Sequence, residues 1–123
     1  NFIGLSDNSK LQRFWASGSK IESYDFSKMT NLRDVNLASA AVKEIKGLSA
    51  AGANLQNLQL SNTHVASLDI SNNPNLEHIW IKNTNIKVLD VSKNPKLKKI
   101  TVDEGTKIIG PTNAQIEYNK STE

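Results

Sequence analysis

Two tryptophans, Trp15 and Trp80, are the residues of this chain best suited to binding chemistry. An indole has a large flat apolar face and one N–H donor, so an exposed tryptophan is typical of protein-binding hot spots and of platforms that stack on sugar rings. A structural interpretation stays open beside the functional one. In that interpretation Trp15, which lies in the first repeat present, is covered by other sequence or by a second copy of the chain. Trp80 then packs over Lys82 or Gln59 as a cross-strand neighbour.

Catalytic chemistry finds little support in the residue types. His64 and His78 are the only histidines, and neither has a second histidine, a cysteine or a carboxylate cluster at metal-ligand spacing. The chain has no cysteine, no glycine-rich phosphate loop and no nucleophile elbow. We therefore expect no enzymatic activity and no cofactor. His64 is predicted in a turn, and His78 on a sheet face where it can join a contact patch beside Trp80.

Three aspartates, Asp25, Asp69 and Asp90, recur at one point of a sequence repeat. Stacked carboxylates are a possible site for a cation such as calcium, which prefers oxygen ligands. Capping of turns is the favoured interpretation, because Lys46 interrupts the column and no Asp-x-Asp-x-Asp loop occurs. A column of serines that favour turns lies at the second position after this point of the cycle, at Ser6, Ser27, Ser71 and Ser92.

The elements that carry these side chains follow from a period near 21 residues. Residues 65–76 and 86–97 match position for position at a distance of 21 residues, and the preceding steps are 23 and 21 residues. Each repeat reads Leu-x-x-Leu-x-Leu, in which apolar and outward residues alternate as in a strand with one buried face. The sequence therefore predicts a stack of short parallel strands joined by return arms.

One repeat is two residues longer than the others. Residues 46–54 are rich in alanine, and Gly47 stands where the other repeats have an apolar residue. The pattern predicts a single helical turn there, with Leu48 supplying the missing apolar contact. Residues 1–103 are predicted to hold five repeats, the first of them truncated, and residues 104–123 a C-terminal capping segment and tail.

The Leu-x-x-Leu-x-Leu strand and the arm Leu89-Asp90-Val91-Ser92-Lys93-Asn94-Pro95-Lys96-Leu97 resemble the leucine-rich-repeat family. They are similar to the short repeats of bacterial surface and secreted proteins, of the internalin-like and Bacteroidetes types. The resemblance implies an α/β-type right-handed solenoid with a curved parallel β-sheet on its concave face, and extended or short helical return arms with little helix. It also implies a bacterial protein that is secreted or lies on the cell surface. The buried asparagine of the family motif is replaced here by Ser19, Ala40, Thr63, Thr84 and Gly105.

Strand alternation decides which side chains lie on the outer face of the predicted sheet. Trp15 and Trp80 lie three strands apart, about 14 Å at the usual strand spacing, so a single small ligand is not expected to touch both. A protein segment or an oligosaccharide is long enough. Other residues placed outward include Asp34, Ser61 and Thr101. The predicted partner-binding residues on the concave face are Arg13, Trp15, Asn36, Asn57, Gln59, His78, Trp80 and Lys82.

Composition narrows the class of partner. The net charge is +3 with scattered basic residues, which gives weak support for nucleic-acid binding. No apolar stretch approaches the roughly 20 residues of a membrane-spanning helix, so membrane insertion is not expected. We expect a monomeric recognition module that binds a protein. The alternatives are carbohydrate binding, for which Asn36, Asn57 and Gln59 between the tryptophans are suitable, and a spacer that binds nothing.

Overall fold

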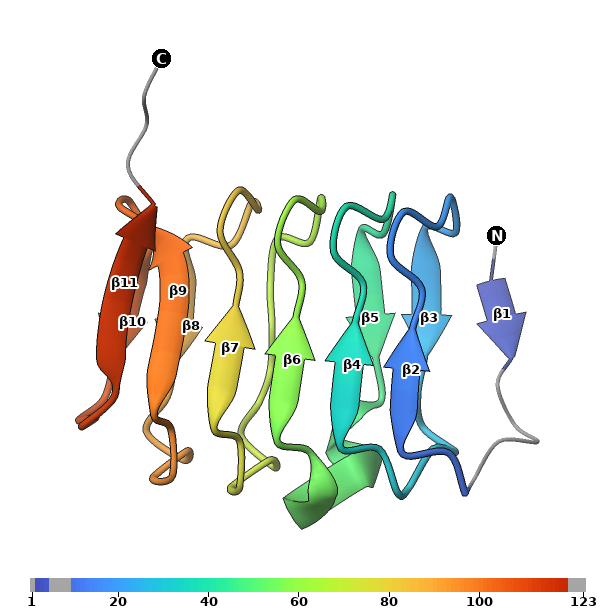
Figure 1. Ribbon diagram of the computed structural model, residues 1–123, viewed down its shortest axis with the longest axis horizontal. Helices are drawn as coiled ribbons and strands as arrows, with labels where there is room; N and C mark the ends of the chain where they lie inside the picture. Colours follow the sequence, from blue (N-terminus) through green and yellow to red (C-terminus); the bar gives the residue numbers. More distant parts are fainter. Residues whose placement is uncertain (1, 5–9, 120–123) are drawn as a thin grey trace.

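The computed structural model describes residues 2–4 and 10–119, and it is a parallel β-solenoid (Figure 1). Short strands form two rows, one on each side of the coil. The front row is a six-stranded sheet in the order β11-β9-β7-β6-β4-β2, which we call the long sheet. Its strands are β2 (Arg13–Trp15), β4 (Asp34–Asn36), β6 (Asn57–Gln59), β7 (His78–Trp80), β9 (Lys99–Asp103) and β11 (Gln115–Asn119).

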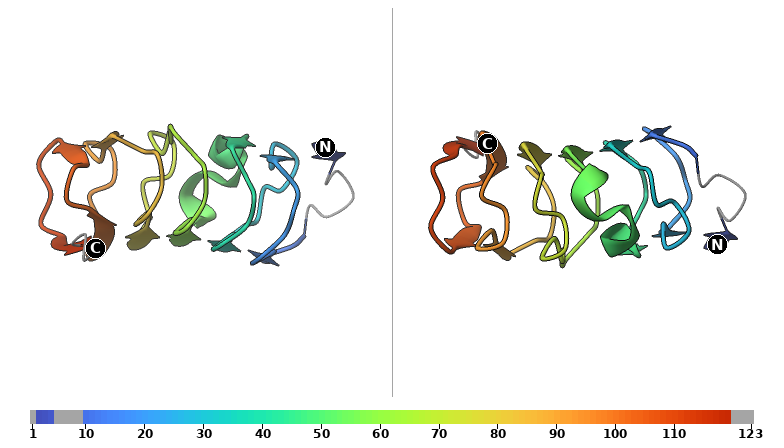
Figure 2. Two further views of the ribbon diagram at one scale, coloured as in Figure 1. Left: turned by 90° about the horizontal axis from the view of Figure 1, so that it is seen from above. Right: turned by 90° about the horizontal axis from the view of Figure 1, so that it is seen from below.

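The return arms form the second row, which is divided into two smaller parallel sheets in the orders β1-β3-β5 and β10-β8. The sequence predicted extended arms, and the structure pairs several of them as strands, since consecutive arms lie in register with their backbones side by side. Figure 2 shows the two rows enclosing one interior. The strands of this row are β1 (Phe2–Gly4), β3 (Ser23–Asp25), β5 (Glu44–Lys46), β8 (Val88–Asp90) and β10 (Lys107–Ile109).

The strand register follows the sequence period. Arg13 pairs with Asp34 at a distance of 21 residues, and Asp34 pairs with Asn57 at the longer step of 23. The final step is shorter, because Lys99 pairs with Gln115 after 16 residues. Residues after position 103 thus add β10 to the return side and β11 to the long sheet, extending the coil by strands on both sides.

The interior is filled by the apolar columns that the repeat pattern predicted. The second residue of each long-sheet strand packs in or against the core, and Val35, Leu58, Ile79 and Ile100 are at most 1% exposed. Burying an aliphatic side chain of this kind stabilises the fold by about 1.5–3 kcal/mol. The return arms fill the opposite side with Phe26, Ile70 and Val91, each of them buried.

The longer repeat forms the expected helical turn, which is a 3-10 element, η1 (Leu48–Asn54). Leu48 is buried in it, as the sequence predicted. The element begins after Gly47, whose φ is 80°, and contains a kink at Gly52, whose φ is 50°. Both angles lie in the left-handed region that glycine adopts without a steric penalty. The next return arm forms no strand, so the return row is interrupted between β5 and β8.

Two buried asparagines, Asn73 and Asn94, hold the return arms together, a role that sequence reasoning missed. Asn94 Nδ2 donates to the carbonyl oxygens of Ile70 and Asn73, at 3.0 and 2.9 Å. Asn73 Nδ2 donates to the carbonyl of Leu48 at 3.1 Å. These bonds satisfy backbone groups that form no ladder bond. The signal was available, because both asparagines precede a proline at the same point of the 21-residue cycle.

Candidate functional site

The outer face of the long sheet carries two parallel rows of side chains, and we call it the long-sheet face. In the three-residue strands β4, β6 and β7 the first and third residues point outward, since the middle residue is buried. The rows are set by the strand register, which aligns Trp15 with Asn36, Asn36 with Gln59 and Gln59 with Trp80. Trp15 is 66% exposed, as the alternation predicted, whereas Trp80 is half-buried.

A hollow with a volume of about 370 Å³ lies on this face between the two tryptophans. Strand spacing alone predicted that one small ligand would not touch both indoles, but both side chains line this one hollow. The reason is size, because the residues between them in the row, Asn36 and Gln59, are smaller than tryptophan. The lining residues are Arg13, Trp15, Asp34, Val35, Asn36, Asn57, Gln59 and Trp80.

Six of the eight predicted binding residues line the hollow, and two do not. His78 lies next to it and Lys82 lies beyond it, exposed in the turn after β7. Asp34 also lines the hollow, although the sequence analysis placed it on the outer face without including it among the predicted binding residues. Its position opposite Arg13 in the repeat register was the available signal, because opposite charges at facing positions pair across a sheet.

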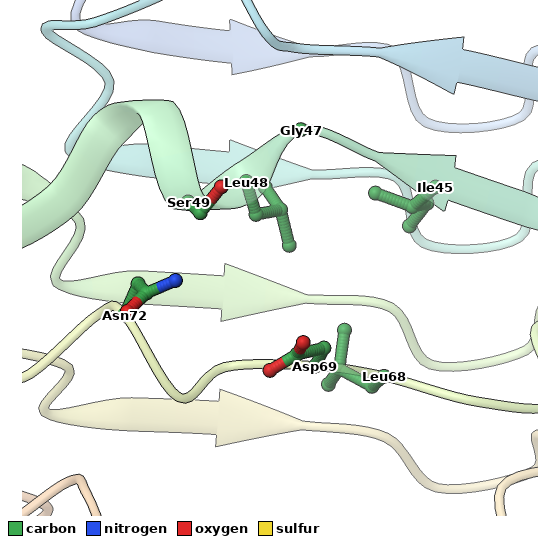
Figure 3. A pocket seen from close by; sticks show the side chains of 7 residues that line it. All are labelled: Ile45, Gly47, Leu48, Ser49, Leu68, Asp69 and Asn72. Carbon is green, nitrogen blue, oxygen red and sulfur yellow. The ribbon is translucent and has the colours of Figure 1, made fainter.

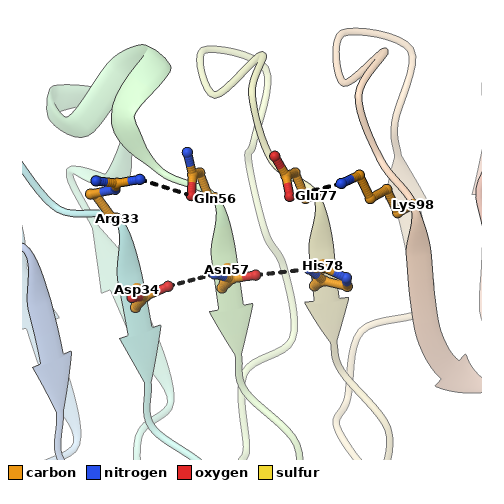
Figure 4. Close-up of polar contacts among 7 residues, drawn as sticks. All are labelled: Arg33, Asp34, Gln56, Asn57, Glu77, His78 and Lys98. Atoms are coloured by element: carbon orange, nitrogen blue, oxygen red, sulfur yellow. Dashed lines mark hydrogen bonds and ion pairs between the residues drawn. The ribbon is translucent and has the colours of Figure 1, made fainter.

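A ladder of polar contacts crosses four strands along one side of the hollow, and Figure 4 shows its part from Asp34 through Asn57 to His78. Arg13 Nε lies 3.4 Å from Asp34 Oδ2, and Asn57 Nδ2 donates to Asp34 Oδ1 at 2.5 Å. Asn57 Oδ1 then faces His78 Nδ1 at 2.9 Å. Because an amide oxygen accepts only, His78 must carry its proton on Nδ1 in its neutral form. The ladder fixes the side of the hollow and neutralises its two charges.

The amides of Asn36 and Gln59 have their oxygens already engaged. Asn36 Oδ1 accepts from the backbone N–H of Ala38 at 3.0 Å, and Gln59 Oε1 accepts from that of Ser61 at 2.9 Å. These contacts fix the amide orientation, since the backbone N–H needs an acceptor. Among the described residues, neither NH₂ group has a hydrogen-bond partner. The lining amides therefore offer unused donors.

Each tryptophan is braced by a neighbour on its own strand. The ring of His78 stacks on Trp80 with centroids 5.6 Å apart and an angle of 16° between the planes. The guanidinium of Arg13 lies 5.9 Å from the ring centroid of Trp15, a distance at which cation–π attraction acts. The imidazole of His78 therefore contacts the half-buried indole of Trp80, which also has Gln59 as its register neighbour on β6. Both indoles are thus held in place before any ligand binds.

Two residues predicted to be exposed on this face are buried, Ser61 and Thr101, at 3% and 6% exposure. Thr101 lies between Trp80 and Glu117 in the register, and both of these side chains are larger than its own. Ser61 follows Gln59, whose side chain folds back to its backbone N–H. Neither residue belongs to the predicted binding set, whose eight members are all exposed or partly exposed.

The aspartate column caps turns, in agreement with the favoured interpretation. Oδ1 of Asp25, Asp69 and Asp90 accepts the backbone N–H of the serine two residues on, at 2.9, 3.0 and 2.9 Å. The serine hydroxyl bond, followed by the backbone bond, lowers the pKa of Asp69 and of Asp90. For Asp25 the backbone bond is the larger cause of the lowered pKa. Within residues 2–4 and 10–119, no group of three or more histidines, aspartates and glutamates is placed to hold a metal ion.

A second, smaller hollow of about 130 Å³ lies on the return side, where the row of strands is interrupted (Figure 3). The side chain of Asp69 is one of its polar walls, and Ile45, Leu48 and Leu68 are its apolar ones. Asp69 is occupied with capping the backbone N–H of Ser71. This hollow follows from the inserted η1 element, and its small volume suits a few water molecules.

Comparisons with protein families, curated proteins and solved structures find no match to this chain. The fold therefore rests on the strand register and the repeat. In the part of the chain that the structure describes, no helix has the length and apolar character needed to cross a membrane.

Proposed function

We propose that this chain is a non-catalytic recognition module of the leucine-rich-repeat type, which binds a protein partner on the long-sheet face. The observation that carries the proposal is the hollow lined by Trp15 and Trp80, together with the unused amide donors of Asn36 and Gln59. Large amphipathic side chains fixed on a rigid sheet provide contact area at a small cost in conformational entropy. Repeat scaffolds present one extended surface of this kind.

The proposal includes a location and a fold family. Resemblance of the repeats to bacterial surface proteins supports placement outside the cell, either secreted or at the cell surface. The parallel strands, the single short helical element and the Leu-x-x-Leu-x-Leu pattern support the leucine-rich-repeat assignment. A curved sheet with its binding face concave is part of this assignment.

The test is selection from a library of random displayed peptides. The wild-type chain serves as bait, and a double variant Trp15→Ala/Trp80→Ala is used for counter-selection. Val88→Ala is the matched control, because Val88 is 49% exposed on the opposite row of strands. We expect enriched peptides that bind the wild type and the control but not the double variant. Equal binding by the double variant, or no enrichment, contradicts a protein-binding role for the hollow.

Carbohydrate binding is the second candidate, and the amides between two indoles favour it. Sugar rings stack on indole faces, and amide NH₂ groups donate to hydroxyl oxygens. Titration of the wild type with a panel of neutral oligosaccharides, followed by tryptophan fluorescence, tests this function. Saturable quenching that disappears in Trp80→Ala supports it, and unchanged fluorescence across the panel contradicts it.

A further inference from the structure

We infer that the occupant of the hollow is a proline-rich peptide segment in the polyproline II conformation. This inference rests on the proposed protein-binding function and specifies the chemistry of the partner. The inference rests on three properties of the hollow. Its unused hydrogen-bonding groups are donors, its walls are aromatic with no net charge, and its length suits a short peptide.

The hydrogen-bonding groups of the hollow that remain unused are donors. Among the described residues, no hydrogen bond engages the NH₂ groups of Asn36 and Gln59 or the indole N–H groups of Trp15 and Trp80. The acceptors each have at least one partner. Asn36 Oδ1 and Gln59 Oε1 accept backbone N–H groups, and Asn57 Oδ1 faces His78. A complementary ligand therefore supplies acceptors and brings few donors.

Prolyl residues meet this requirement, because proline has a carbonyl oxygen and no backbone N–H. An ordinary extended peptide brings one N–H for each carbonyl, and these donors need acceptors that the hollow has already committed. A sugar brings a donor with every hydroxyl and has the same difficulty. In polyproline II the carbonyls project outward with no internal hydrogen bonds, so they are available to the four donors.

The walls suit pyrrolidine rings. Trp15 and Trp80 offer flat apolar faces, which is how proline-rich segments dock in aromatic-lined grooves. The only charged groups of the lining, Arg13 and Asp34, form an ion pair and so leave no net charge to attract a charged ligand. An uncharged apolar segment fits this environment better than an acidic or basic one.

The length of the hollow fits a short segment. The two indoles lie on β2 and β7, three strand steps apart along the sheet, which is about 14 Å at the usual spacing. Polyproline II rises about 3.1 Å per residue, so four to five residues span that distance. Such a helix is already ordered in solution and loses little entropy on binding. The walls are ordered as well, since His78 braces Trp80 and Arg13 braces Trp15.

The experiment uses a blocked proline decamer as the probe and a blocked glycine–serine decamer of the same length as the control peptide. Binding is followed through the two indole N–H resonances of the ¹⁵N-labelled chain. We expect saturable downfield shifts of both resonances with the proline decamer alone, because carbonyls accept from both indoles. We expect the affinity to fall about tenfold or more in Trp15→Ala and to be unchanged in Val88→Ala.

The outcomes separate this inference from the proposed function. If library-selected peptides without proline bind through the tryptophans and the proline decamer does not, the polyproline inference is wrong and protein binding stands. If neither kind of peptide binds, both proposals are wrong. Equal shifts with the two decamers also overturn the inference, and so do indole shifts produced by cellohexaose and not by the proline decamer.

Discussion

The imidazole of His78 lies almost parallel to the indole of Trp80, with the ring centroids 5.6 Å apart. A bond of 2.9 Å between His78 Nδ1 and Asn57 Oδ1 fixes the imidazole, so the position of the indole depends on a residue one strand away. The same contact connects Trp80 to Asp34 and Arg13 through the polar ladder. The contacts that position the Trp80 wall of the hollow therefore extend along the same face of the sheet from β7 to β2.

Removal of the imidazole is predicted to loosen Trp80. In His78→Ala the stacking partner is lost, and Asn57 Oδ1 loses its neighbour. Aromatic pairs contribute about 0.5–1.5 kcal/mol, so we expect a fall of that size in the free energy of unfolding. Acrylamide quenching of Trp80, measured in a Trp15→Phe background, is expected to rise. Unchanged quenching with unchanged stability would show that the stack does not position the indole.

Gly47 and Gly18 form a matched pair for a test of the turn before η1. Both have positive φ, of 80° and 73°, but a Cβ on Gly18 meets nothing within 4 Å. A Cβ on Gly47 comes within 2.8 Å of Asp25 Oδ1 and closer still to the backbone nitrogen of Ser27. We expect Gly18→Ala to cost about 1–2 kcal/mol and Gly47→Ala about 2–5 kcal/mol. Urea denaturation of both variants is the measurement, and equal losses contradict the steric argument.

Acid is predicted to weaken the turns that Asp25, Asp69 and Asp90 cap. The pKa of each carboxyl is lowered in the fold, so the stabilisation is fully present above the ordinary aspartate value near 4. It is lost as the pH falls through the lowered pKa values. A triple Asp→Asn variant keeps an amide oxygen for each turn but cannot titrate. We expect the urea midpoint of the wild type to fall more steeply below about pH 4 than that of the variant. Parallel pH profiles of the two chains would show that the caps contribute nothing to acid sensitivity.

The sequence predicted the features that depend on a repeated pattern. Alternation fixed the inward column at Val35, Leu58 and Ile79, because a one-residue shift would expose the whole apolar set. It also placed Trp15 and Trp80 outward. The helical turn at Leu48 followed from the extra length and composition of that repeat.

Other features depend on contacts between side chains, which a pattern does not encode. The common hollow of Trp15 and Trp80 depends on the sizes of the side chains that line it, whereas strand spacing alone predicted only that one small ligand would not touch both. Thr101 is buried between its register neighbours Trp80 and Glu117, which alternation alone did not predict. The paired strands of the final turn come from a step of 16 residues, which is shorter than the period that located the others.

Replacing a buried asparagine is predicted to destabilise the fold more than replacing an exposed one. Asn94 is 1% exposed, and its Nδ2 bonds two backbone carbonyls. Asn94→Ala leaves both carbonyls without that donor, and we expect a loss of about 2–4 kcal/mol in the free energy of unfolding. The control is Asn85→Ala, since Asn85 is exposed and its side-chain amide makes a long contact of 3.4 Å to the His64 carbonyl. Its expected loss is below about 1 kcal/mol. Similar urea midpoints for the two variants would contradict a structural role of the asparagine ladder.

The donor character of the hollow is tested by the change of one atom in Gln59. In Gln59→Glu the remaining oxygen still accepts the Ser61 N–H, but the NH₂ donor becomes a second oxygen with a negative charge. Carbonyl oxygens of a ligand then meet a repelling acceptor, so we expect the affinity for the proline decamer to fall about tenfold or more. Gln56→Glu is the control, because Gln56 lies outside the hollow and receives the same change in charge. Titration calorimetry with the decamer compares the two variants. Equal affinities would mean that charge alone matters, or that Gln59 gives no hydrogen bond to the ligand, and the donor-rich hollow would lose its part in recognition.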